Sequence, residues 1–267
     1  MFGFESLFSQ THAYSSQPQV ALARRKELPR IWHTFDPFIA LGMAASVTQN
    51  LKLGTGISLV TERDPILMAK QVATLDHLSN GRLVLGVGAG WNAEEMENHG
   101  TPFDKRWPIL RSVPWRCRKS GLRRGRVPRR ICRFRQNLEY PKPKQSGGPP
   151  ILMGASSRFT YDRIAEYADG WMPIYQTTPV DKPVAASIMR LASLTPGRLW
   201  EARGRDGQPS FSIFGVGPDR RAVSELVELG FDRVLFALPS DSADVVCHWW
   251  KNTPPSPTNF QLKSGMS

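Results

Sequence analysis

The sequence has little of what builds metal sites, disulfide frameworks and membrane spans. Its 267 residues include only three cysteines, and these lack metal-ligand spacing and cannot all pair. No apolar run reaches the roughly 18 residues that a membrane span needs. The first residues, MFGFESLFSQ, lack the basic, apolar and small-residue order of a secretion signal. We therefore expect no metal, no membrane partner and a cytoplasmic location.

Motifs that identify a catalytic mechanism by spacing alone are also missing. No Ser/His/Asp arrangement and no nucleotide-binding lysine loop stands out. The run GVGAG at residues 86–90 falls short of the dinucleotide fingerprint, because Trp91 occupies the place of its third glycine. A protein without its own nucleophile or metal is expected to rely on a bound cofactor for difficult chemistry.

Acidic residues are absent from one segment, residues 111–135, which holds ten arginines and one lysine and dominates the net charge of +12. We find neither helical nor strand periodicity in residues 111–136. A nucleic-acid-binding insertion is one hypothesis, because clustered arginine binds phosphate. The segment has only Trp115 and Phe134 as aromatics and matches no known module, so we do not expect nucleic acid as a partner.

Residues 53–92 contain the clearest pattern, a strand, a helix and a second strand. The strand predicted at 51–60 carries Gly54 and Gly56, which indicates a bulge where a ligand or another backbone comes close. Asp64 and Pro65 are typical of a helix start, and an apolar strand follows at residues 82–90. In such a unit the ligand face lies at the carboxyl ends of the strands.

Strands and helices alternate along the rest of the chain, with seven strands predicted near residues 4, 51, 82, 151, 171, 211 and 233. This alternation favours an α/β fold of the all-parallel barrel type, one strand short of closure. We expect a single domain at residues 1–246, with an aberrant segment at 111–137 and a Pro/Gly linker at 141–150. Residues 247–267 are expected to form a disordered tail.

Three further segments are candidates for ligand contact or helix starts. His12 lies in a polar loop after a predicted strand end, where a barrel places ligand-contacting side chains; an exposed loop histidine is the alternative. Residues 154–157 (GASS) offer backbone amides and hydroxyls to an anion, although a plain helix cap explains them equally well. Residues 92–99 are predicted to form a short helix, and its glutamates complement the positive end of the helix dipole.

The run from LKLGTGISLVTERDP to GRLVLGVGAGWNAEEMENHGTPFDKRW resembles the bacterial luciferase-like monooxygenase superfamily, in particular its coenzyme F-420 (deazaflavin)-dependent oxidoreductases. PPILMGASS and FGVGPDRRAVSELVELGFDRVLFALP look like later units of the same family. The resemblance implies a TIM-type (β/α) barrel that transfers hydride between F-420 and a small organic substrate. An FMN-dependent monooxygenase is the alternative, and a homodimer is a further expectation.

The resemblance also implies a cofactor site. Gly56 and Ile57 match a non-prolyl cis peptide that backs the deazaflavin ring, and Gly88 and Asn92 match positions that contact the cofactor. His12 matches a polar residue beside the reactive ring face and is the predicted catalytic residue. The segment that holds the phosphate is matched by Met153, Gly154, Ala155 and Ser156.

The sequence departs from the family pattern in three places. Ala89 stands where some relatives carry a catalytic glutamate. The family's first strand and helix have no counterpart here, so we expect an incomplete barrel. The arginine-rich segment replaces an amphipathic helix, and our hypothesis is a frameshifted stretch that is in frame again by Leu138, with a second disturbance after Val246. An inactive remnant is therefore a further hypothesis, and reading the coding DNA in the other two frames tests the frameshift.

Overall fold

A parallel β-sheet organises the chain. The computed structural model describes residues 5–9, 35–119, 140–157, 159–175, 200–238 and 242–252. The strands are β1 (Ser6–Ser9), β2 (Lys52–Thr55), β3 (Ser58–Leu59), β4 (Leu83–Gly88), β5 (Ile151–Met153), β6 (Gly170–Trp171), β7 (Ser210–Val216) and β8 (Arg233–Phe236). The α-helices are α2 (Pro37–Val47), α3 (Pro65–Leu78), α4 (Ala93–Asn98), α5 (Arg106–Lys119), α6 (Thr160–Tyr167), α9 (Arg220–Glu228) and α10 (Ala243–Asn252), with 3-10 turns η2 (Val60–Glu62) and η3 (Phe103–Lys105).

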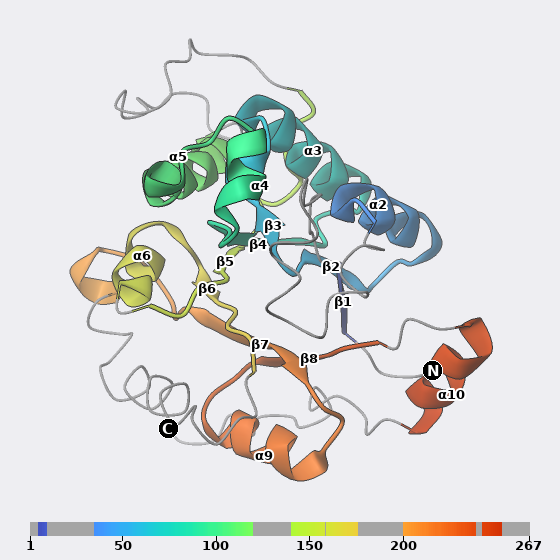
Figure 1. Cartoon of the computed structure of the whole chain (residues 1–267). Helices are drawn as coiled ribbons and strands as arrows, with labels where there is room; N and C mark the ends of the chain where they lie inside the picture. Colours follow the sequence, from blue (N-terminus) through green and yellow to red (C-terminus); the bar gives the residue numbers. More distant parts are fainter. Residues whose placement is uncertain are drawn as a thin grey trace.

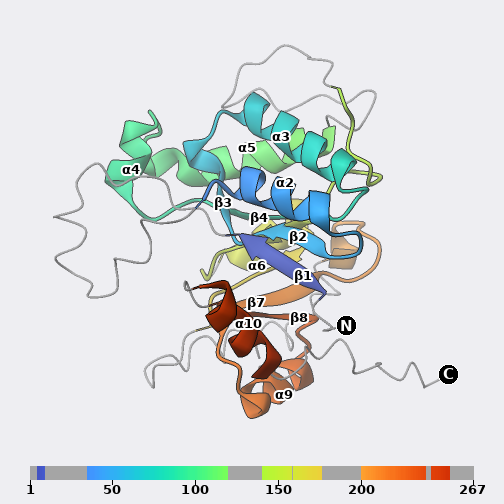
Figure 2. The same cartoon turned by 90° about the vertical axis from the view of Figure 1, so that its right-hand side faces the viewer.

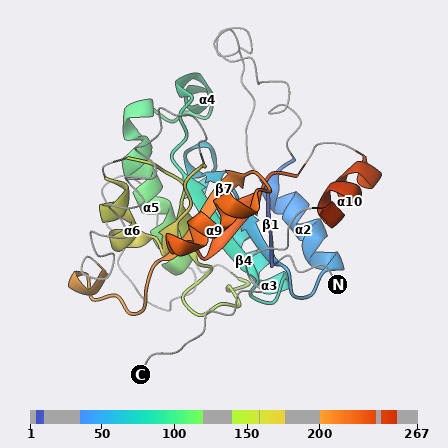
Figure 3. The same cartoon turned by 90° about the horizontal axis from the view of Figure 1, so that it is seen from below.

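The strands follow the order β1-β2-β4-β5-β6-β7-β8, with β3 paired to β4, and every pairing is parallel. The sheet curves into a nearly closed barrel with helices on its outside (Figure 1). Helices α2 and α3 lie side by side over β2 and β4, as Figure 2 shows, and α9 covers the outside of β7 and β8 (Figure 3). The α/β barrel predicted from strand and helix alternation is therefore confirmed.

Strand β4 shows why the apolar pattern produces this layering. All of its residues are buried. Leu83, Leu85 and Val87 belong to the large core that also includes Met68 and Val72 of α3. Val84, which points to the opposite face, packs in a separate inner cluster with Leu152, Met172 and Leu235. A strand buried on both faces is expected to read as a continuous apolar run.

The predicted start of α3 is confirmed in atomic detail. The carboxylate oxygen Oδ1 of Asp64 accepts the amide N–H groups of Ile66 at 3.0 Å and Leu67 at 2.8 Å. Asp36 caps α2 in the same way. At the other end of α3, Asn80 and Gly81 adopt positive φ angles of 56° and 80°, which ends the helix.

One ion-pair network joins the two ends of the strand order. Arg233 in β8 donates from Nη2 to Oε1 of Glu5 at 3.0 Å, and Lys52 in β2 lies 3.0 Å from the same oxygen. Burial alone would raise the pKa of the Glu5 carboxyl, but the hydrogen bonds and charges of Arg233 and Lys52 outweigh it and lower that pKa. No hydrogen-bonded pairing joins β1 to β8 among the described strands, so this network links the ends of the sheet.

Helix α5 corrects the interpretation of the arginine-rich segment. We predicted no helix from residue 111 onward, yet α5 continues to Lys119. Leu110 is fully buried and sets the position of the helix on the core before the arginines begin. Arginine has a high helix propensity, so the charged residues extend a helix that packing has already positioned. Residues 120–139 lie outside the described part of the chain.

Three other boundaries differ from the prediction. The strand expected at 51–60 is two strands, β2 and β3, separated at residues 56–57. The helix expected to be capped by Ser156 and Ser157 begins at Thr160. Helix α10 occupies residues 247–252, the start of the segment expected to be disordered, while residues 253–267 lie outside the described part. Each difference concerns the boundary of an element, which a sequence pattern places least precisely.

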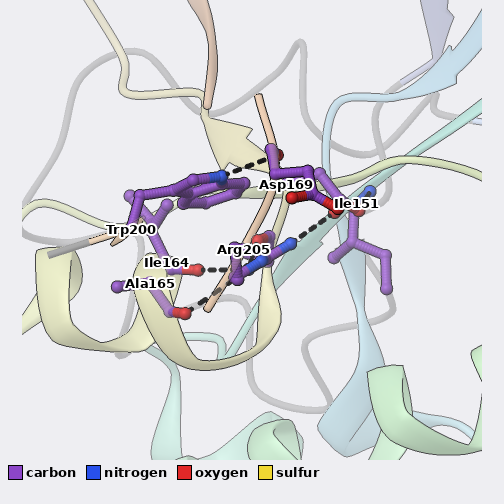
Figure 4. A network of polar contacts seen from close by, with 8 residues as sticks. Ile151, Ile164, Ala165, Asp169, Trp200 and Arg205 are labelled. Carbon is purple, nitrogen blue, oxygen red and sulfur yellow. Dashed lines mark hydrogen bonds and ion pairs between the residues drawn. The ribbon is translucent and has the colours of Figure 1, made fainter. Parts of the chain in front are cut away.

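Polar contacts fix the outer side of β5 and β6. Arg205 donates from Nη2 to Oδ1 of Asp169 at 2.7 Å, and its Nη1 donates to the carbonyl oxygens of Ile164, at 3.0 Å, and Ala168 at the end of α6. The other oxygen of Asp169 accepts the amide N–H of Ile151 at 2.8 Å. The guanidinium lies 3.7 Å from the ring centre of Trp200 (Figure 4). We call these residues the Asp169–Arg205 network.

Candidate functional site

Ile57 and two glycines meet at the carboxyl ends of β2, β4 and β5, with Ile57 in the short link from β2 to β3. A Cβ atom added to Gly88 would lie 2.0 Å from Cδ1 of Ile57, and one added to Gly154 would lie 2.6 Å from its Cγ2. The side chain of Ile57 therefore fills the space that a side chain at position 88 or 154 would need. Both positions require glycine for this reason. Three of the positions predicted to contact the cofactor, far apart in sequence, are thus brought together.

The peptide bond that precedes Ile57 has the predicted geometry. Gly56–Ile57 is a non-prolyl cis peptide. Ile57 packs against the inner cluster of the barrel together with Phe8 and Phe214. A Cβ atom on Gly56 would lie 3.2 Å from the ring of Phe214. The bulge inferred from the glycines is therefore a close approach between backbone and side chains at the rim of the barrel.

The segment predicted to hold a phosphate follows β5. The amide of Gly154 donates to the carbonyl of Val87 at 2.8 Å, and the carbonyl of Ala155 accepts the indole N–H of Trp171 at 2.6 Å. Ser156 is exposed. The amide of Ser157 donates to Oγ1 of Thr160 at 2.9 Å, so it serves the first turn of α6. Among the described residues no acceptor meets the amides of Ala155 and Ser156, so these two amides could meet an anion.

A positive charge lies beside this segment, which the sequence analysis missed. Arg163 in α6 places its guanidinium 3.7 Å from the ring centre of Trp107, and its Nη1 lies 3.4 Å from Oγ of Ser157. Stacking on an aromatic ring fixes the guanidinium without neutralising its charge. Its position three residues after Thr160, on the face of α6 that returns to Ser157, is the signal that could have revealed it.

Asn92 stands at the start of α4 but does not cap it. It is 6% exposed, and its side chain makes no capping hydrogen bond to the helix. Gly90, two residues earlier, has a φ of 74°, and Trp91 between them is 61% exposed. The buried amide of Asn92 is therefore available for a role other than helix capping.

Glu62 and Glu95 form a buried carboxyl pair that the sequence analysis also missed. Their exposed fractions are 7% and 5%. Burial, with a further contribution from the charge of Glu95 and opposition from Arg63, raises the pKa of Glu62 to about 8. We had assigned Glu95 to the favourable positive end of a helix, but it packs inward. No sequence signal separates it from the exposed Glu94 and Glu97 except helical phase.

Several predictions fall where the structure gives no test. His12, the predicted catalytic residue, lies outside the described residues, as does the polar loop around it. Within the described ranges, no three His, Cys, Asp or Glu side chains form a group that could hold a metal ion. None of the described helices is both long enough and apolar enough to cross a membrane.

Fold and site together define an α/β-barrel protein with a glycine-lined candidate site at the carboxyl ends of neighbouring strands. The sequence model of the luciferase-like monooxygenases matches residues 2–215. The chain therefore belongs to the luciferase-like monooxygenase family, and it is an oxidoreductase by class. The resemblance inferred from the sequence is confirmed.

The relatives include both uncharacterised proteins and enzymes. A Mycobacterium tuberculosis protein described as uncharacterised is 36% identical over 221 residues, which cover 80% of this chain and 73% of the relative. A phthiodiolone/phenolphthiodiolone dimycocerosates ketoreductase of the same species is 28% identical and covers 65% of this chain and 46% of the relative.

Two solved structures share the fold. A monooxygenase from Streptomyces bottropensis aligns with a TM-score of 0.58 and 21% identity, over 72% of this chain and 58% of its own. The oxygenating component of 3,6-diketocamphane monooxygenase from Pseudomonas putida, a type II Baeyer-Villiger enzyme solved with FMN, aligns with a TM-score of 0.58 and 18% identity, over 85% and 62%. The chain spans about six tenths of the length of both structures.

Proposed function

We propose that this chain is a deazaflavin-dependent oxidoreductase that transfers a hydride between coenzyme F-420 and a small organic substrate. The observation that carries the proposal is the convergence of Ile57, Gly88 and Gly154 at the carboxyl ends of three strands. FMN is the alternative cofactor, favoured by the FMN-bound state of the Pseudomonas putida relative. The ketoreductase among the relatives supports a carbonyl or alcohol as the reacting group of the substrate.

The residues present fit a planar cofactor with an anionic tail. Gly56 and Ile57 offer a backbone wall, and Gly88 and Gly154 leave no side chain of their own in front of it. The amides of Ala155 and Ser156 with the guanidinium of Arg163 offer donors and positive charge to a phosphate. When bound, the cofactor supplies hydride transfer, and the protein orients it. His12 is proposed to hold the proton that accompanies the hydride.

Titration of the purified protein with coenzyme F-420 and, separately, with FMN tests this proposal. Binding is followed by the change in cofactor fluorescence. The proposal predicts that F-420 binds more tightly than FMN, and the reverse order would favour the monooxygenase alternative. Binding of neither would contradict the cofactor proposal while leaving the family membership intact.

A matched pair of glycine variants locates the binding site. Gly154→Val places atoms where the side chain of Ile57 and the carbonyl of Val87 already lie, so we expect at least a tenfold loss of cofactor affinity. Gly217→Ala, at the end of β7, meets no atom within 4 Å and should bind like the wild type. Equal affinity of the two variants would place the site elsewhere.

The assembly and the location of the enzyme belong to the same proposal. We propose a homodimer through α2, because Ile39, Met43 and Val47 recur every fourth residue on its outer face and are 68%, 71% and 81% exposed. Met43→Glu should then yield monomers in sedimentation velocity, and an unchanged species would exclude this face. The cytoplasmic location stays a prediction that cell fractionation tests.

A further inference from the structure

Ile174 is an exposed apolar residue on the inner side of the barrel rim. It follows β6 and forms a parallel bridge with Phe214 of β7. Residues paired in register point to the same face of a sheet, and both Phe214 and Met172 belong to the inner side of the barrel. Ile174 therefore faces inward as well, yet it is 63% exposed. It is an inward-facing apolar side chain that a ligand can reach at the carboxyl ends of the strands.

Backbone hydrogen bonds hold Ile174 in this position. Strands β6 and β7 lie side by side (Figure 1). The amide of Phe214 donates to the carbonyl of Pro173 at 2.9 Å, and the amide of Tyr175 donates to the carbonyl of Phe214 at 2.7 Å. Tyr175 packs against the large core on the opposite face of the sheet. The alternation of a strand thus continues past β6, so a paired backbone presents Ile174 to the interior.

Phe214 connects Ile174 to the glycine-lined candidate site. A Cβ atom on Gly56 would lie 3.2 Å from Cε2 of the Phe214 ring, so this ring reaches from β7 to the end of β2. Ile57, the next residue along the chain, packs against the same inner cluster as Phe214. Ile174 and Phe214 therefore continue the inner wall of the barrel from the proposed cofactor site toward β6 and β7.

The described charged groups lie away from this part of the rim. Lys52 and Arg233, which pair with Glu5, are the first residues of β2 and β8 and lie at the opposite end of the strands. Arg163 stacks on Trp107 between α5 and α6, outside the strands. The inward-facing residues described near the carboxyl ends are apolar or glycine: Phe8, Gly88, Gly154, Met172, Ile174, Phe214 and Leu235. A charged substrate would lose water here without gaining a described partner.

We propose that the substrate is an uncharged ketone, aldehyde or alcohol with a bulky apolar body, and that this body packs on Ile174 and Phe214. Its role as a substrate rests on the proposed function, because the hydride transfer requires the cofactor. Ile174 determines specificity in this scheme. Apolar surface buried against it favours binding, whereas a carboxylate in the same place keeps an uncompensated desolvation cost.

A matched pair of ligands tests this class of substrate on the purified protein, without any cofactor. Benzophenone is a bulky uncharged ketone, and benzoylbenzoate is the same molecule with one carboxylate added. In isothermal titration calorimetry, benzophenone should bind at least tenfold more tightly. Ultraviolet irradiation then attaches the bound benzophenone to C–H groups that it touches, and the labelled peptide should contain residues 172–175 or 211–216. Equal affinities, or label confined to other residues, would overturn the proposal.

Variants of Ile174 test the contact itself. Ile174→Asn should weaken benzophenone binding at least fivefold, whereas Ile174→Leu should retain the affinity within about twofold. Leu78→Asn makes a similar change at the last residue of α3, which is 75% exposed, and should bind like the wild type. Equal losses in the two asparagine variants would indicate unspecific binding. A fall in the melting temperature of Ile174→Asn as large as for a core residue would mean that the chain itself covers Ile174, and it would also overturn the proposal.

Measurements with the cofactor separate this inference from the proposed function. If neither F-420 nor FMN binds, the proposed function fails, while calorimetry and labelling still decide whether the rim takes an uncharged apolar ligand. If a cofactor binds, Ile174→Asn should raise the KM for apolar ketones at least fivefold and keep kcat within about twofold. Competition between benzophenone and the bound cofactor for one place, or an effect on kcat alone, would contradict the role of Ile174.

Discussion

The Asp169–Arg205 network and the Glu62–Glu95 pair differ both in depth and in partners: the Asp169 side chain is 28% exposed, whereas Glu62 is 7% exposed. Asp169 accepts one guanidinium N–H and one backbone N–H, and Arg205 also donates to carbonyls at the end of α6. Glu62 accepts no hydrogen bond from any described residue. The same barrel therefore holds a partly buried carboxylate with several donors and a buried carboxyl group, that of Glu62, with none among the described residues.

The number of hydrogen-bond partners indicates how each site affects the stability of the fold. A partly buried charge with several hydrogen-bond partners fixes structure, because a change leaves a donor or acceptor unpaired. A buried carboxyl without partners gives up stability, and proteins retain such groups where the protonation state matters. The Asp169–Arg205 network therefore holds the end of α6 against β5, whereas the burial of Glu62 without a described donor raises its pKa and makes stability depend on its protonation.

The largest expected effect comes from breaking the complete network. Asp169→Ala leaves the Arg205 guanidinium and the Ile151 amide without their acceptor, so we expect a loss of about 2–4 kcal/mol in the free energy of unfolding. Urea denaturation measures it. Asp162→Ala, on the exposed side of α6, should change stability by less than about 0.5 kcal/mol. Equal effects would mean that the network contributes nothing specific.

The next effect has the opposite sign and depends on pH. The pKa of Glu62 is raised from 4.5 to about 8, so the folded protein holds a proton that the unfolded chain releases. Stability is therefore greatest below about pH 4.5 for this group and is lost as the pH rises through about 8. Glu62→Gln removes that loss and should be about 1–3 kcal/mol more stable than the wild type at alkaline pH. Denaturation at a series of pH values measures it, and parallel curves for the two proteins would contradict it.

A smaller loss is expected when the charge of the network is kept and its geometry is removed. Lysine at position 205 cannot present the planar fork that reaches both Asp169 and the α6 carbonyls. We expect Arg205→Lys to cost about 1–2 kcal/mol. Combined with Asp169→Ala, the two losses should fall short of their sum, because the residues share one interaction. Additive losses in urea denaturation would show that the contacts act independently.

The smallest effect sets the baseline for both sites. Gly42 lies inside α2, away from both sites, and a Cβ atom there meets nothing within 4 Å. Gly42→Ala should raise stability by about 0.5–1 kcal/mol through helix propensity alone. The gain should be the same at every pH. A gain that varied with pH would show that groups outside the two sites contribute to the pH dependence of denaturation.

Much of the fold could be predicted from local patterns. The starts of α2 and α3 followed from Asp-Pro pairs, and β4 followed from an apolar run bounded by glycines. The failures fall where local signals are weak. Arginine-rich residues of α5 form a helix because buried Leu110 positions it, and the start of α6 moved because Ser157 bonds to Thr160 instead of capping.

The candidate site was predictable only in part. The glycines at 56, 88 and 154 carry a signal, because each ends or directly follows a strand, and the structure brings them together around Ile57. Arg163 carried only the weak signal of its helical position after Thr160, and Glu62 carried none, since one arginine or glutamate among many looks like an exposed charge. Their roles come from what packs against them, Trp107 for the first and Glu95 for the second.

The sequence by itself determined the alternation of strands and helices, the barrel class and the family, because these depend on periodicity, caps and glycine positions that are local along the chain. Tertiary structure decided which of the glutamates of α4 is buried, which aspartate completes a network, and that β1 and β8 meet through Glu5 and Arg233. Burial and charge pairing depend on neighbours distant in sequence. Local sequence patterns therefore predict the fold of this chain, whereas the protonation of Glu62 is set only when η2 and α4 pack together.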